Sequence, residues 1–134
     1  MSNTQPTGVA FADPEFTTCY ATQEIGYATA AQGTVTQATS KSTGVTLNKS
    51  SGQITMNNAA LANGAVVTFT LTNNLLSAKD VIIVNVSGGA TTAGTYTALV
   101  SSIGAGSAVL GLYNISAGSL SEAVVLNYAI FHGQ

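Results

Sequence analysis

Residues 66–72 carry the clearest pattern in the chain, a strict alternation of apolar and threonine side chains after Val66. Val67, Phe69 and Leu71 fall on one face of an extended chain and the threonines on the other, which predicts a strand with one buried face. Residues 80–86 form an almost unbroken apolar run, which predicts a strand buried on both faces. Further short runs rich in β-branched residues predict strands over residues 34–39, 44–47, 53–56, 95–100, 107–114 and 122–131.

About eight strands separated by turns rich in Gly, Asn and Ser predict an all-β fold. Their spacing is typical of an antiparallel β-sandwich, and we expect a jelly-roll-like arrangement, with another Greek-key sandwich as the alternative. Residues 48–52 have the length and polarity of a hairpin loop, and residues 58–64 have the Asn and Gly that bound a short helical turn. The side chains expected between the sheets are Phe69, Leu71, Ile82, Val84, Leu126 and Tyr128.

The first 28 residues do not share this pattern. They show neither helical nor strand periodicity, and proline interrupts regular pairing in them. A frayed terminus is one interpretation. The other is an arm that docks on a partner, because four aromatic side chains in a segment without its own core suit a groove on another chain. We therefore predict an extended N-terminal arm over residues 1–28 and a β-sandwich body over residues 29–134.

Charged residues make up 6% of the 134 residues, against about 25% in an average soluble domain. Three lysines and no arginine are too few positive charges for electrostatic binding of nucleic acid. One His and one Cys are too few ligands for a structural zinc site. No apolar run approaches the ~20 residues of a membrane-spanning helix, and the first residues do not resemble a signal peptide. We expect a protein made in a cytoplasm, without a membrane partner. Its weakly charged surface favours self-association.

The candidate chemistry is sparse. His132 lies after the last predicted strand, and we interpret it as an exposed residue of the tail. Cys19 has no cation beside it in the sequence to activate a thiolate, so we expect a packing residue. Asp13 and Glu15 lie in a stretch that does not fix the separation needed by paired catalytic carboxylates. The glycine-rich segments lack a phosphate-loop signature and are read as turns. We therefore expect no enzyme activity, no cofactor and no metal.

Several segments resemble stretches of small β-rich virion proteins of tailed bacteriophages, and the chain looks most similar to capsid decoration (cement) proteins. The resemblance extends over roughly residues 26–134 and leaves the arm unmatched. The segments keep their order and spacing, but no catalytic signature is among them. They are residues 33–49, 52–56, 67–73, 80–85 and 117–127.

The resemblance implies a structural protein of the virion that binds the capsid exterior, is made in the bacterial host cytoplasm and forms a homotrimer. Its partner would be the major capsid protein. The near alternative is a head- or tail-fibre domain for receptor or carbohydrate binding, and an unrelated sandwich module is the third. Part of the subunit contact could come from Tyr96, Tyr113 or Tyr128.

For the decoration role, we expect the arm to be the main capsid-binding element. Its apolar anchors would be Phe11, Phe16 and Tyr20. Its carboxylates would pair with basic groups on the shell and fix orientation more than affinity. These acidic candidates are Asp13, Glu15 and Glu24.

Overall fold

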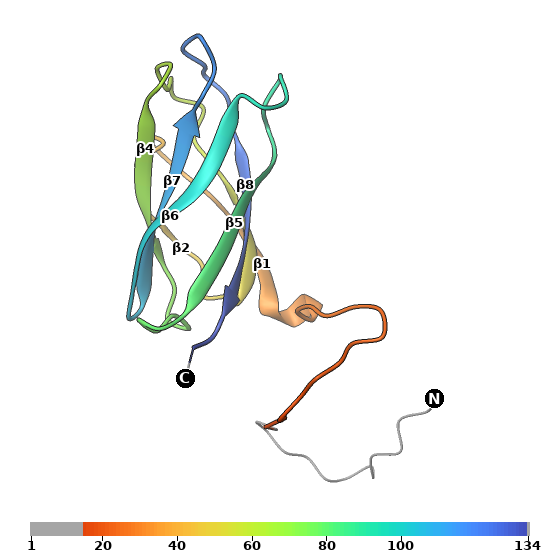
Figure 1. Cartoon of the computed structure of the whole chain (residues 1–134). Coiled ribbons are helices and arrows are strands. Elements are labelled where there is room, and N and C mark those ends of the chain that lie inside the picture. Colours follow the sequence, from red (N-terminus) through yellow and green to blue (C-terminus); the bar gives the residue numbers. More distant parts are fainter. Residues whose placement is uncertain (1–14, 134) are drawn as a thin grey trace.

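The computed structural model describes residues 15–133, and in it the chain forms two four-stranded sheets packed face to face (Figure 1). One sheet has the strand order β1-β3-β8-β5 and the other the order β2-β4-β7-β6. The predicted all-β sandwich of eight strands is confirmed. The strands are β1 (Gln32–Thr36), β2 (Val45–Thr46), β3 (Ser51–Thr55), β4 (Val66–Thr72), β5 (Val81–Gly88), β6 (Tyr96–Gly104), β7 (Ser107–Asn114) and β8 (Val125–Phe131), preceded by the 3₁₀ turn η1 (Thr29–Ala31).

Consecutive strands lie in different sheets except β6 and β7, which form the one sequential hairpin among the described strands. Four of the strand pairs are antiparallel, whereas β1 pairs with β3 and β2 pairs with β4 in parallel. The expected hairpin around residues 48–52 is therefore wrong. The backbone of β2 pairs with β4, while the Leu47 side chain lies against Gly33 and Gly52, where any added Cβ would come within 3 Å of it. The segment thus packs over the edge of one sheet while its backbone pairs with the other.

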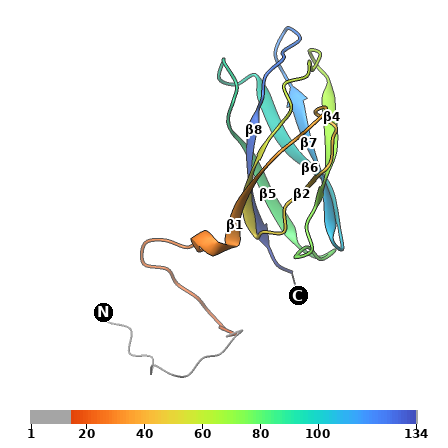
Figure 2. The ribbon, with the colours of Figure 1, turned by 180° about the vertical axis from the view of Figure 1, so that it is seen from behind.

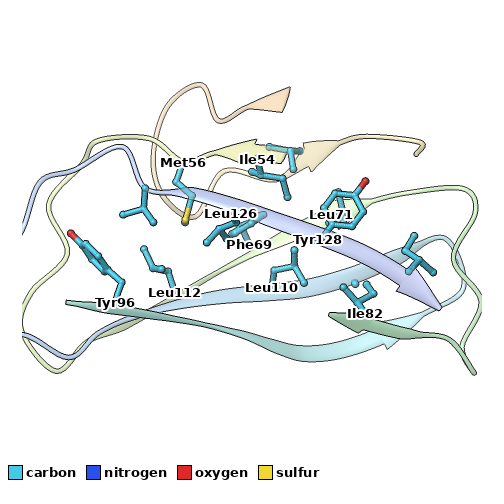
Figure 3. Close-up of a cluster of buried hydrophobic side chains, with 14 of the residues drawn as sticks. Ile54, Met56, Phe69, Leu71, Ile82, Tyr96, Leu110, Leu112, Leu126 and Tyr128 are labelled. Atoms are coloured by element: carbon cyan, nitrogen blue, oxygen red, sulfur yellow. The ribbon is translucent and has the colours of Figure 1, made fainter. Parts of the chain in front are cut away.

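The core lies between the sheets, and Figure 3 shows its side chains meeting there from both layers. Phe69, Leu71, Leu126 and Tyr128 are at most 3% exposed, as expected from the alternation of their strands. Ile82 is also buried, and Val84 is partly buried against the same cluster. Burying each large apolar side chain contributes about 1.5–3 kcal/mol, so this layer is the main source of stability.

The predicted helical turn over residues 58–64 is wrong. The backbone N–H of Leu61 donates to Leu120, and the N–H of Leu120 donates back, which forms an isolated antiparallel bridge. The Asn114 side chain is fully buried and donates to the carbonyls of Leu61 and Gly118. These long-range bonds satisfy backbone groups that a helical turn would have used, and only a tight turn, in which the N–H of Ala65 donates to Ala62, follows Leu61.

A buried lysine closes one end of the sandwich. Lys41 is 3% exposed, and its ammonium donates to the backbone carbonyls of Asn57 and Glu122. Burial lowers the pKa of Lys41, while the Glu122 carboxylate partly offsets this. The buried amide of Gln37 donates to the carbonyls of Lys41 and Thr43, and β1 accordingly ends at Thr36 rather than at residue 39 as predicted.

Candidate functional site at the arm end of the sandwich

The part of the predicted arm that the structure describes, residues 15–28, contains no strand or helix and leads away from the body (Figures 1 and 2). Its large apolar side chains face solvent: Phe16 is 63% exposed, Tyr20 is 90% exposed and Ile25 is 85% exposed. Isolated exposed apolar residues are common, but three along one short segment without a core are typical of an interaction surface.

The predicted capsid-contact residues that the structure describes lie exposed along the arm. Glu15, Phe16, Tyr20 and Glu24 are all exposed and lie spread along the arm, and they do not converge on one point. Phe11 and Asp13 lie outside the described residues. Cys19 is exposed as well, so its expected role as a packing residue is wrong, because the arm around it offers no core to pack into.

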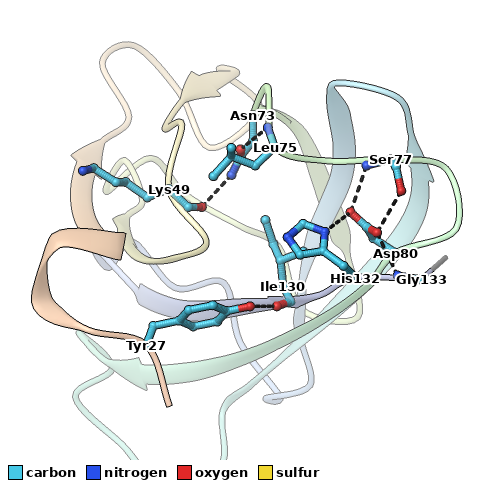
Figure 4. A network of polar contacts seen from close by, with 9 residues as sticks. All are labelled: Tyr27, Lys49, Asn73, Leu75, Ser77, Asp80, Ile130, His132 and Gly133. Carbon is cyan, nitrogen blue, oxygen red and sulfur yellow. Dashed lines mark hydrogen bonds and ion pairs between the residues drawn. The ribbon is translucent and has the colours of Figure 1, made fainter. Parts of the chain in front are cut away.

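Hydrogen bonds fix the place where the arm leaves the body. The Tyr27 hydroxyl donates to the carbonyl of Ile130 on β8 (Figure 4). The side-chain amide of Gln32 donates to the carbonyl of Tyr27 at 3.0 Å. One turn further on, the Lys49 ammonium donates to the carbonyl of Ala30 at 2.9 Å. The arm therefore starts beside the carboxyl end of β8.

A carboxylate ties the C-terminal residues to the same end. Asp80 accepts bonds from the backbone N–H of Ser77 at 2.9 Å, the Ser77 hydroxyl at 2.8 Å and the N–H of Gly133 at 3.0 Å, and it contacts His132 Nδ1 at 3.0 Å (Figure 4). The Ser77 N–H, helped by the other donors, lowers the pKa of Asp80 to about 2. His132 is exposed, as expected from its position after the last strand. Its ring is 46% exposed but is held by Asp80.

Three apolar side chains form an exposed patch beside the hydrogen bonds of Asp80. Val81 is 58% exposed, Ile83 is 56% exposed and Phe131 is 54% exposed, and we call them the β5–β8 patch. Val81 lies directly opposite Phe131, and Ile83 lies opposite Ala129, so the three are neighbours on the outer face of the sheet. The expectation that residues 80–86 are buried on both faces is wrong for Val81 and Ile83. Only the inward positions of this strand pack on the core.

A shallow groove crosses the outer face of the same sheet. It has a volume of about 420 Å³, and its lining carries amide and hydroxyl groups without aromatic side chains. Within it, the side-chain amide of Gln53 donates to that of Asn127 at 3.0 Å. The lining residues are Thr29, Gln32, Gly33, Thr34, Ser51, Gly52, Gln53 and Asn127.

The tyrosines considered as subunit contacts are mostly internal. Tyr96 is 7% exposed and Tyr128 is 2% exposed, so neither can reach a second folded subunit. Burial raises the pKa of both to about 12, with the Glu122 carboxylate adding to the effect at Tyr96. Tyr113 is half-buried and stays a candidate.

Residues 15–133 contain no group of three or more His, Cys, Asp or Glu side chains able to hold a metal ion. Over the same residues there is no helix long and apolar enough to cross a membrane. The described residues offer three surfaces to a partner, namely the arm, the β5–β8 patch and the groove.

Comparison with known proteins returned no match: no protein-family model, curated protein or solved structure is similar to this chain.

Proposed function

We propose that this protein is a structural component of a phage virion that binds the outside of the capsid lattice and stabilises it. The observation that carries the proposal is the arm, an exposed segment with aromatic side chains that leaves a closed β-sandwich. The resemblance of the body to decoration proteins supplies the identity of the partner, the major capsid protein. In this role the body forms a homotrimer and the arm is the attachment.

The arm is chemically suited to a groove on a protein shell. Phe16 and Tyr20 offer large apolar surfaces, and such side chains dominate binding energy when a partner encloses them. Glu15 adds an exposed carboxylate that basic groups on the shell would orient. Ordering an extended segment costs roughly 2–5 kcal/mol, which several arms on one oligomer offset through effective concentration.

No catalysis is assigned to this protein. The ring of His132 is engaged by Asp80, which also holds Ser77 and Gly133, and this arrangement connects the last residues to the body. The ionisable groups at the opposite end, Lys41 and Glu122, bind backbone N–H and carbonyl groups of neighbouring loops. The shifted pKa values of Asp80, Lys41 and Glu122 thus come with contacts that hold the ends of the sandwich together. Such a structural role suits a protein that binds and stabilises a shell.

Deleting residues 1–23, which removes Phe16 and Tyr20 and keeps Glu24 and Ile25, tests the proposal. We expect a folded body with an almost unchanged melting temperature that no longer co-sediments with undecorated shells. The Phe16→Ala/Tyr20→Ala variant should weaken shell binding by a few kcal/mol. Ile115→Ala is the matched control, because Ile115 is 49% exposed on the body, and it should bind normally. Wild-type occupancy of shells by the truncated protein would overturn the arm as the contact.

The groove supports the alternative, a fibre domain that binds receptor carbohydrate. Amide and hydroxyl groups such as those of Gln53 and Asn127 can bond sugar hydroxyls, although sugar sites usually add an aromatic platform. Glycan binding by the wild-type protein that is lost in Gln53→Ala/Asn127→Ala, together with no binding to shells, would favour this function.

A further inference from the structure

The β5–β8 patch is an exception on the surface of the sandwich. Outward-facing positions on the other strands are mostly polar, for example Thr34, Gln53 and Thr70. On β5 the outward positions Val81 and Ile83 are apolar and more than half exposed. A strand that is apolar on both faces is typical of burial on both faces, and this chain covers only one.

The position of β5 at the edge of its sheet is a second reason to expect a covering partner. It is the last strand of its sheet, so the described part of the chain offers no strand that pairs with its outer edge. Natural proteins protect such edges with charges, proline or a covering segment. From Val81 to Val86 the strand has neither charge nor proline, and a bulge follows only at residues 86–88. β6 of the facing sheet packs beside β5, but nothing in the described residues covers the outward side chains of Val81 and Ile83, so a covering segment is expected over this face.

The charges around the patch indicate what covers it. Lys79 is exposed two residues before Val81, and the partly exposed ring of His132 follows Phe131. The carboxylate between them, Asp80, is fully buried and already bonded. The rim of the patch is thus open to a negatively charged partner.

The base of the arm carries the complementary groups. Glu24 is exposed, and the adjacent Ile25 is 85% exposed. Among residues 15–133, the fully exposed carboxylates are those of Glu15 and Glu24, both on the arm. Tyr27 holds the arm base beside Ile130, at the end of the sandwich that bears the patch, while the arm itself leads away from its own body (Figures 1 and 4).

We propose that Glu24 and Ile25 of one copy cover the β5–β8 patch of a second copy. Ile25 packs against Val81, Ile83 and Phe131, and the Glu24 carboxylate pairs with the Lys79 ammonium. Because arm base and patch lie at the same end of the body, copies arranged around a symmetry axis there can exchange arms so that every patch is covered. Glu24 then belongs to the contact between copies, while Phe16 and Tyr20 stay free for another partner.

Sedimentation of the purified protein without shells tests this inference independently of the proposed function. We expect the wild type to self-associate at micromolar concentration. Val81→Thr/Ile83→Thr keeps β-branched residues on the strand and should raise the dissociation constant about tenfold or more. Val66→Thr is the matched control, since Val66 is 52% exposed on the other sheet, and it should associate like the wild type.

Arm variants test the other half of the contact without touching the fold of the body. Ile25→Ser should weaken association as the patch variant does, whereas Phe16→Ala should not. Lys79→Glu should weaken it a few-fold, and adding Glu24→Lys should restore it. A monomeric wild type would overturn the inference. So would association that survives Ile25→Ser, or an arm whose amide protons are protected in a monomer, which would place the arm on its own body. Normal self-association of the patch variant with lost shell binding would assign the patch to the shell.

Discussion

At the scale of single residues, the side chains that hold the ends of the sandwich are polar and bonded to backbone. Asp80 holds the C-terminal residues, and Lys41 holds the opposite end by donating to two carbonyls. Buried polar groups are costly unless they are paired, so each of these contacts constrains several loops at once. Of these two residues, Asp80 has the larger pKa shift, so the pH dependence of the free energy of unfolding should reflect the ionisation of Asp80.

Asp80 should make stability depend on pH in the acidic range. Its folded pKa of about 2 lies below the ordinary value of 3.8, so the folded state binds fewer protons than the unfolded state. The stabilisation is complete above the ordinary pKa and is lost as the pH falls toward 2. In thermal melts, Asp80→Asn should be less stable than the wild type at neutral pH, and the difference should shrink through this window.

The exposed Glu15 provides the control for that measurement. Glu15→Gln lies on the arm, outside the sandwich, and should melt like the wild type at every pH. A constant difference between wild type and Asp80→Asn from pH 7 to pH 2 would contradict the assignment of the acid-sensitive step to Asp80.

At the scale of elements, the loop between β5 and β6 must pass close to the segment before β8. Gly89 has φ +79°, and a Cβ added there would lie 2.1 Å from the carbonyl oxygen of Ala123. Gly94, in the same loop, has φ +77° but open space around it. The two glycines share a backbone conformation and differ in their surroundings.

Alanine at these positions separates strain from steric clash. Gly94→Ala should cost about 1–2 kcal/mol, the cost of a left-handed conformation for a residue with a Cβ. Gly89→Ala should cost about 1–3 kcal/mol more, because the loop must also move away from Ala123. Urea unfolding measures both, and equal losses for the two variants would mean that the close approach at Gly89 is relieved without cost.

At the scale of the whole molecule, nearly every strand pairing joins segments distant in the sequence. Only β6 and β7 are connected by a short turn, whereas β8 must find both β3 and β5. Such topologies fold in milliseconds to seconds, because the entropy of loop closure is lost before the stabilising long-range contacts form.

The sequence also places both prolines, Pro6 and Pro14, before the first strand. We therefore expect stopped-flow refolding of the full chain in milliseconds to seconds, without the phase of tens of seconds that prolyl isomerisation causes. Folding in microseconds, or a dominant slow phase, would contradict this topology as the determinant of the rate.

The sequence by itself determined the features that depend on local period and composition. Alternation in residues 66–72 predicted β4 with its bounds and its buried face, including Phe69 and Leu71, because side chains of an extended chain alternate whatever lies around them. Residues 15–28, where the sequence shows no period, contain no strand or helix, and Phe16 and Tyr20 there are exposed.

Only the tertiary structure decided which segments meet. Residues 44–47 and 53–56 look like a hairpin, yet they join different sheets, because β2 pairs with β4 whereas β3 pairs with β1 and β8. The almost unbroken apolar run of β5 predicts burial on both faces, but Val81 and Ile83 point to the outer face of a two-layer sandwich, where no described element covers them. The local pattern indicates which side chains of a strand favour burial. The arrangement of the strands decides whether another part of the same chain covers them or whether they are left for a second chain to cover.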